Sequence, residues 1–272
     1  MLTTLNYFQA FLIGSCIGSF LNVVIYRFPS NLSIVKPRSF CPKCKSKLTW
    51  RENIPLISWL IQKGSCINCG ISISIRYPLI ELITAILFII FTKSSPSLYS
   101  SSSNLFFNIF FSWLYISLLI CITLIDIKYL WIPQGLINFG FLSGLIGLNF
   151  IGLFNDKFID FFLLAKGLSA SLISFFIFET LRYLAKYIYK KEAIGKGDSK
   201  LVAMLALWLG PMGILFAVGI SYIFAAIYCL IGLSTNRMNF RQVIPFAPFL
   251  SLGGLLMWFL GNDFIFEKIL RI

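Results

Sequence analysis

Histidine is absent from the 272 residues of this chain. Its absence excludes Ser-His-Asp triads, Cys-His dyads, histidine metal ligands and the H-E-x-x-H metalloprotease site. Acidic residues are also scarce, with 10 Asp and Glu against 23 Lys and Arg, and charged residues make up only 12% of the chain. Acid–base chemistry must therefore use Asp, Glu, Lys, Tyr or Cys, and each carboxylate near a membrane segment can be considered individually.

Apolar residues make up 58% of the chain, and the mean hydropathy is +0.86. A soluble globular domain is about 45–50% apolar and about 25% charged. The composition therefore predicts an all-α polytopic membrane protein. Apolar runs predict eight membrane helices, near residues 5–26, 78–92, 105–125, 135–154, 158–181, 200–215, 213–232 and 246–261. The sixth and seventh runs are poorly separated around Gly210, Pro211 and Gly213, so seven spans is the main alternative.

Most of the 23 basic residues fall in four loops, at 27–77, 126–134, 182–200 and 233–245. Cytosolic loops of membrane proteins collect Lys and Arg. We therefore expect these loops to be cytosolic and both termini to lie on the non-cytosolic side. The start of the chain has no basic region or cleavage site typical of a signal peptide, so the first apolar run is expected to stay as a helix.

We expect three parts in the chain: a first transmembrane helix at 1–28, a polar cytosolic insert at 29–77 and a membrane core at 78–272. The insert holds two C-x-x-C pairs, Cys41 with Cys44 and Cys66 with Cys69. Such paired spacing is typical of a tetrathiolate Zn²⁺ site. Disulfides or a redox dithiol are the alternatives, but the cytosol keeps thiols reduced. Four thiolates close the coordination shell, so the zinc is expected to be structural.

Two aspartates differ from the other carboxylates in their position. Asp126 ends an apolar run, and Asp198 opens another after Gly195 and Gly197. In the expected topology both lie at the cytosolic membrane edge, where an ionisable group suggests a function. Two such carboxylates can share a proton if their helices touch, giving the general base and general acid that amide hydrolysis needs. The glycines would leave the backbone open to an extended substrate segment.

The alternative for each aspartate is an ion pair with a nearby lysine, Lys128 or Lys200. Two other carboxylates are assigned pairs as well. Glu81 stands beside Arg76 at the start of the second span, and an interfacial ion pair is expected there. Glu179 lies one turn before Arg182, so an i,i+3 pair is the default.

Several segments, in order along nearly the whole chain, resemble the type IV prepilin peptidases. They are Gly18–Pro29, the two cysteine pairs, Leu48–Trp59, Arg76–Glu81, Leu124–Asp126 with Ile132–Pro133, Gly195–Leu201 and Pro245–Leu250. The resemblance implies an aspartyl protease of the bacterial inner membrane with Asp126 and Asp198 as its catalytic pair. The implied substrates are prepilins or pseudopilins of type IV pilus and type II secretion systems. One departure is Gln134, where the family often has Asp or Asn.

The resemblance also implies a second activity, methylation of the new N-terminal amine with S-adenosylmethionine. The sequence holds no Gly-rich methyltransferase loop, so the cofactor residues are not identified. We expect the donor to bind between the insert and the membrane core, close to the aspartates. Glu52 and Glu81 are the candidates for taking the amine's proton. No nucleic-acid partner is expected.

Other functions remain open at this point. A peptidase that has lost methylation is one alternative, although the four cysteines argue against it. A proton-coupled transporter would use two membrane carboxylates as a relay, but such sites lie near mid-bilayer on broken helices. A zinc-stabilised membrane scaffold without catalysis would keep its function after either aspartate is replaced.

Overall fold

The structure is a computed structural model that describes residues 2–41, 43–94, 105–154, 161–190, 195–239 and 242–264. In the described part, the regular structure is helical apart from two isolated β-bridges. The chain forms two compact units, residues 1–94 and 95–272. The first contains α1 Leu2–Arg27, η1 Phe28–Ser30, η2 Arg51–Asn53, α2 Ile57–Ile61 and α3 Arg76–Ser94. The second contains α4 Leu105–Tyr129, α5 Gln134–Phe154, α6 Phe161–Tyr189, α7 Lys196–Ser234 and α8 Ala247–Phe264.

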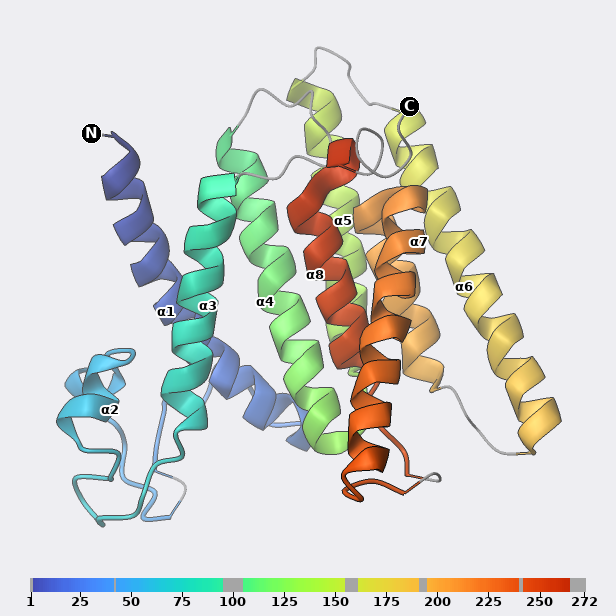
Figure 1. The fold of residues 1–272 in the computed structure, drawn as a ribbon. Helices are drawn as coiled ribbons and strands as arrows, with labels where there is room; N and C mark the ends of the chain where they lie inside the picture. Colours follow the sequence, from blue (N-terminus) through green and yellow to red (C-terminus); the bar gives the residue numbers. More distant parts are fainter. Residues whose placement is uncertain are drawn as a thin grey trace. The chain divides into compact units, whose positions relative to one another are not determined.

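In the first unit α1 and α3 lie side by side (Figure 1) because two glycines remove the side chains between them. A Cβ added to Gly14 would lie 2.7 Å from the Cα of Ala85, and one added to Gly18 would lie 2.7 Å from the Cα of Glu81. This G-x-x-x-G spacing puts both glycines on one helix face, which lets membrane helices approach closely. The sequence predicts a boundary between the insert and the membrane core at residue 78; in the structure α3 groups with α1 in the first unit.

We predict that Gly14→Ala lowers the stability of the first unit by about 1–3 kcal/mol, because the added methyl group meets backbone that cannot move aside. Gly219→Ala is the matched control, since a Cβ there meets nothing within 4 Å. Losing a helical glycine without a clash should stabilise by about 0.4–1 kcal/mol. Thermal unfolding in detergent measures both effects, and equal unfolding temperatures for the two variants would contradict the close packing.

Three aromatic side chains from α4, α7 and α8 form the core of the second unit. The Tyr115 ring is fully buried, with its centroid 5.1 Å from that of Trp208 and 4.9 Å from that of Trp258. The Trp208 indole N–H donates to the Gly140 carbonyl at 2.9 Å, and the Trp258 indole N–H donates to the Ser112 hydroxyl at 2.9 Å. Both indoles are therefore satisfied inside an apolar environment.

The long element α7 turns back on itself at Gly210, whose φ is 71° and ψ is 179° (Figure 1). A Cβ on Gly254 would contact Leu205, before the turn, whereas one on Gly253 would contact Ala217, after it. In a straight helix, residues 205 and 217 would be about 18 Å apart. Leu205 and Ala217 instead lie next to consecutive residues of α8, so the parts of α7 before and after Gly210 run antiparallel. This agrees with the turn that the sequence predicts near Gly210.

Four described helices are long and apolar enough to cross a membrane: Tyr7–Ser30, Phe106–Tyr129, Phe162–Ile188 and Lys196–Ser234. A shorter apolar helix covers Ala247–Gly261. The observed helices lie where the apolar runs predicted them, and the chain is a helical membrane protein. The part of α7 before Gly210 is shorter than the about 20 residues that a span needs. The count of eight spans, and the side on which the termini lie, stay predictions.

Candidate functional site

Asp126 is buried in the last turns of α4, with 5% of its surface exposed. Its Oδ2 accepts a hydrogen bond from the backbone N–H of Ala247, 3.1 Å away, at the first residue of α8. The first N–H groups of a helix have no intrahelical partner. The carboxylate therefore satisfies one of them, and the contact joins the end of α4 to the start of α8.

Asp198 lies in the first turn of α7, where the helix dipole favours a negative charge. Its Oδ2 accepts a hydrogen bond from the backbone N–H of Gly195, 3.2 Å away. A side chain on Gly195 would stand 3.1 Å from the same carboxylate oxygen. The residue before the helix is therefore a glycine that leaves space for the Asp198 carboxylate.

The structure brings these two carboxylates together within the second unit. The charge of Asp126 lies close enough to Asp198 to act on it. The charge of Asp198 in turn acts on the hydroxyl of Tyr222, which lies in the part of α7 after the turn. The Tyr222 ring packs on Phe246 with centroids 5.2 Å apart, and Phe246 directly precedes the residue that donates to Asp126. The ends of α4, α7 and α8 thus meet around one acidic pair.

The alternative ion pairs, of Asp126 and Asp198 with Lys128 or Lys200, do not form in the described part of the chain. The Lys128 ammonium lies 4.8 Å from the centroid of the Tyr129 ring. Lys200 donates to the side-chain oxygen of Gln134. Both lysine ammonium groups therefore contact partners other than the two aspartates. Among the described residues, a salt bridge forms instead between Arg182 and Glu179, at 2.6 Å, as their spacing predicts.

Gly197 packs against the loop after α4. A Cβ at this position would lie 3.0 Å from the Ile132 side chain. The missing side chain lets the first turn of α7 close onto Ile132. That Gly197 also leaves the backbone open to a substrate segment stays a prediction.

Four thiols gather in the first unit, as the spacing of Cys41, Cys44, Cys66 and Cys69 predicts. All four sulfur atoms lie within 4.8 Å of one another, and those of Cys41 and Cys69 are 3.8 Å apart. A tetrahedral zinc with Zn–S bonds of about 2.3 Å sets its sulfur atoms about 3.8 Å apart. The residues therefore fit a tetrathiolate zinc ion.

The two cysteine pairs have matching backbone turns. The N–H of Cys41 donates to Ser46, and a β-bridge joins Phe40 to Lys47 around the first pair. The second pair repeats this pattern, because Cys66 N–H donates to Ile71 and a β-bridge joins Ser65 to Ser72. The fifth residue of each turn has a positive φ, 56° at Lys45 and 67° at Gly70. Hydrogen bonding to Ser46 lowers the pKa of Cys44 to about 6. Despite a backbone hydrogen bond from Ile71, burial and the neighbouring thiols raise the pKa of Cys69 to about 11.

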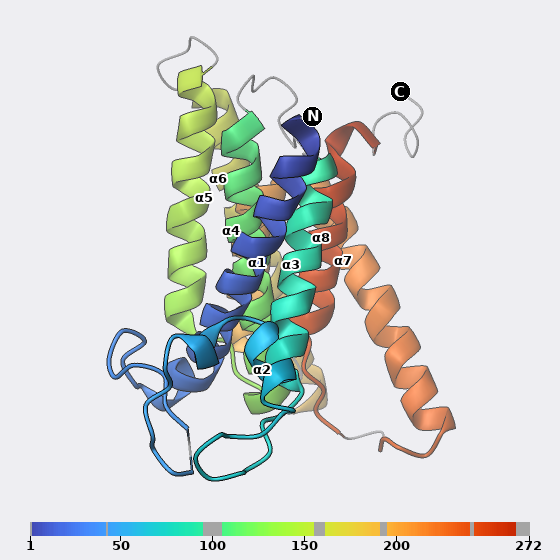
Figure 2. The same cartoon turned by 90° about the vertical axis from the view of Figure 1, so that its left-hand side faces the viewer.

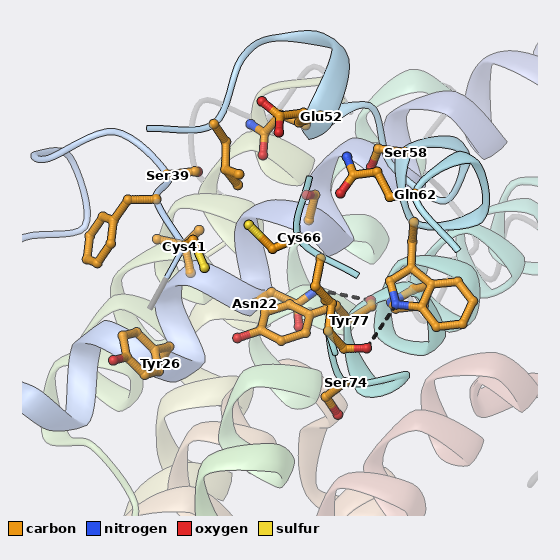
Figure 3. A pocket seen from close by; sticks show the side chains of 18 of the residues that line it. Asn22, Tyr26, Ser39, Cys41, Glu52, Ser58, Gln62, Cys66, Ser74 and Tyr77 are labelled. Carbon is orange, nitrogen blue, oxygen red and sulfur yellow. Dashed lines mark hydrogen bonds between the residues drawn. The ribbon is translucent and has the colours of Figure 1, made fainter. Parts of the chain in front are cut away.

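A cavity of about 420 Å³ lies in the first unit between α1, the insert and α3 (Figure 3). Both Glu52 and Glu81 line it, as do Cys41 and Cys66 of the cysteine cluster. Glu81 does not pair with Arg76 in the described structure, so that expectation is wrong. The two residues are five apart and do not face each other on a helix. The Glu81 Oε2 instead accepts the backbone N–H of Leu56, 2.7 Å away.

The chain matches two family models. Residues 12–94 match the bacterial peptidase A24 N-terminal domain, and residues 113–230 match the type IV leader peptidase family. An Escherichia coli protein named type 4 prepilin-like proteins leader peptide-processing enzyme is 35% identical, with 89% of each chain covered. The chain belongs to the type IV leader peptidase family. A Bacillus subtilis member named prepilin leader peptidase/N-methyltransferase is 34% identical over 94% of each chain. No solved structure matches this member of the family.

In this member of the type IV leader peptidase family, each family model matches residues of one structural unit. The first model includes the four cysteines and the cavity, whereas the second includes both aspartates. The sequence did not single out three residues that line the cavity: Asn22, Trp59 and Tyr77. A signal was present, because each lies in a segment that resembles the family, namely Gly18–Pro29, Leu48–Trp59 or Arg76–Glu81.

Proposed function

We propose that this protein cleaves the leader peptide from type IV prepilin or pseudopilin precursors at the cytosolic membrane face. We further propose that it methylates the new N-terminal amine with S-adenosylmethionine. The names of its relatives support both steps, since they describe leader peptide processing and N-methyltransferase activity.

The observation that carries the cleavage proposal is the acidic pair, Asp126 with Asp198. These carboxylates come from distant parts of the sequence, the charge of Asp126 acts on Asp198, and in the described residues neither has a cationic partner. Like charges at close range favour one shared proton. The pair then offers a base and an acid at once, as in aspartic proteases.

The chemistry of leader cleavage follows from these two roles. The ionised carboxylate takes a proton from water, and the water oxygen bonds to the scissile carbonyl carbon. The protonated carboxylate gives its proton to the leaving nitrogen as the C–N bond breaks. Because Asp126 receives the Ala247 N–H and Asp198 receives that of Gly195, each carboxylate is held by the backbone before substrate arrives.

We propose that Cys41, Cys44, Cys66 and Cys69 hold a structural zinc. The sulfur positions support it, and four protein thiolates leave no open position for a reacting group. The insert has short helices and two isolated bridges, so metal binding would supply much of its folding free energy.

Incubation of the purified protein with a pilin precursor, with and without S-adenosylmethionine, tests the proposal. Intact-mass analysis should show loss of the leader in both samples and one added methyl group only where the donor is present. Cleavage without methylation, in protein that carries its full zinc content, would reduce the function to that of a peptidase. An unchanged precursor would contradict the proposal as a whole.

A further inference from the structure

We propose that the cavity in the first unit is the binding site for S-adenosylmethionine, with Glu81 and Glu52 facing the cationic part of the donor. This assignment rests on the proposed methyltransferase function and adds the site to it. The volume of about 420 Å³ falls in the range of about 300–1,000 Å³ that is typical of sites for ligands of this size. All lining residues belong to the same unit.

The cavity is acidic although the protein is strongly basic. The chain carries a net charge of +13, and the insert alone contains many lysines. The charged residues that line the cavity are nevertheless two carboxylates, Glu52 and Glu81, and one guanidinium, Arg27. S-adenosylmethionine carries one net positive charge, from a sulfonium, an ammonium and a carboxylate. The charges of site and ligand are therefore complementary.

Arg27 does not neutralise either carboxylate. Its side chain is buried and donates to the carbonyl groups of Ser33, at 3.0 Å, and Arg38, at 3.4 Å. Among the described residues no ion pair involves Glu52 or Glu81. Burying an ionised carboxylate without a cationic partner is costly. A cationic ligand in the cavity would remove this cost at Glu81, whose exposed fraction is 8%.

Backbone contacts fix the positions of both carboxylates. The Leu56 N–H holds Glu81 at 2.7 Å, and the Thr49 N–H and hydroxyl both hold the Glu52 Oε2 at 2.7 Å. The Thr49 hydrogen bonds lower the pKa of Glu52, so this group is ionised at neutral pH. The carboxylates thus come from different segments and are oriented by groups of the protein itself, and such preorganisation favours tight binding.

Aromatic and amide groups complete a site suited to the adenine ring. Tyr26, Trp59 and Tyr77 line the cavity and offer flat apolar surfaces. Figure 3 shows Tyr26 and Tyr77 among the lining residues. The Trp59 indole N–H is held by the Ile73 carbonyl at 3.1 Å. The Asn22 amide nitrogen donates to the carbonyl of Tyr77 at 3.1 Å. None of the described residues donates a hydrogen bond to the Asn22 amide oxygen, which leaves this acceptor for a donor such as an adenine amino group.

The cavity shares a wall with the cysteine cluster. Cys41 and Cys66 belong to both, and Figure 3 shows them on the same side of the cavity, across from Gln62. When bound, the donor supplies its methyl group to the amine nitrogen, as the carbon–sulfur bond breaks and its electron pair goes to sulfur. Glu81 or Glu52 accepts the proton that the amine loses. Metal binding holds the wall of this site in place.

Isothermal titration of S-adenosylmethionine into the purified full-length protein tests the assignment. Glu81→Gln keeps the size of the side chain and an oxygen for the Leu56 N–H but removes the charge. We expect its affinity for the donor to fall at least about tenfold. Glu179→Gln, the same substitution in the second unit, should bind as the wild type does. Ser58→Trp, which fills the cavity without changing its charge, should abolish binding.

Zinc content and unfolding temperature show whether each variant is folded. Wild-type affinity in both Glu81→Gln and Ser58→Trp would overturn the cavity assignment while leaving methylation intact. Loss of affinity in Glu179→Gln equal to that in Glu81→Gln would also overturn it. If the wild-type protein neither binds the donor nor methylates a cleaved pilin, the proposed methyltransferase function itself fails, and this assignment fails with it.

Discussion

Asp126→Asn and Asp198→Asn are each expected to abolish leader cleavage, lowering its rate by at least about a thousandfold. General acid–base catalysis typically contributes about 10²–10⁴-fold, and both roles depend on the one pair. Asparagine has nearly the size of aspartate, but its amide cannot exchange the proton. Its side-chain oxygen still accepts the Ala247 or Gly195 N–H, so the helix ends should stay together.

A peptidase assay on a pilin precursor, followed by gel or mass analysis, measures this loss. Cys121→Ala is a matched control on α4, because Cys121 is buried one turn and a half before Asp126 and has no proposed role. The control should cleave at close to the normal rate. Normal cleavage by either asparagine variant would exclude the acidic pair as the catalytic centre.

Replacing any one of Cys41, Cys44, Cys66 or Cys69 by serine should remove most of the zinc and reduce methylation far more than cleavage. The reason is spatial, since the cysteine cluster and the cavity share a wall in the first unit, while Asp126 and Asp198 belong to the second. Structural zinc sites supply folding free energy directly, so the insert should loosen as well.

Metal analysis and the two activity assays together measure this prediction. Cys16→Ser is the matched control, because this exposed cysteine of α1 lies outside the cluster. It should retain one zinc ion per chain and both activities. Equal loss of cleavage and methylation in a cluster variant whose second unit remains folded would contradict the assignment of methylation to the first unit and cleavage to the second.

Local patterns in the sequence were enough to predict the helices and the cysteine cluster. Long apolar runs predicted helices because a membrane leaves the backbone no other way to satisfy its polar groups. The cluster followed from the two C-x-x-C pairs, whose short spacing already determines how two thiols of a pair can meet. The turn at Gly210 was likewise expected from neighbouring glycine and proline residues.

Features built from distant segments were harder to predict. The predicted topology placed Asp126 and Asp198 at one depth. The hydrogen bond from the Ala247 N–H to Asp126 was not predicted, although Ala247 lies in the Pro245–Leu250 segment that resembles the family. The cavity draws on segments from α1, the insert and α3, so its outline appears only after folding. The pairing of Glu81 was mispredicted because nearness in sequence was taken as contact on the helix.

Photo-cross-linking of a bound precursor tests the central claim, that the scissile bond is cut between Asp126 and Asp198, most directly. A pilin precursor with a photoreactive side chain next to the scissile bond would be incubated with Asp198→Asn, which is expected to bind without cutting. The account predicts cross-links to the end of α4 and the start of α7, identified by peptide mass analysis. Cross-links confined to other helices, in a precursor that the wild-type protein cleaves, would contradict it.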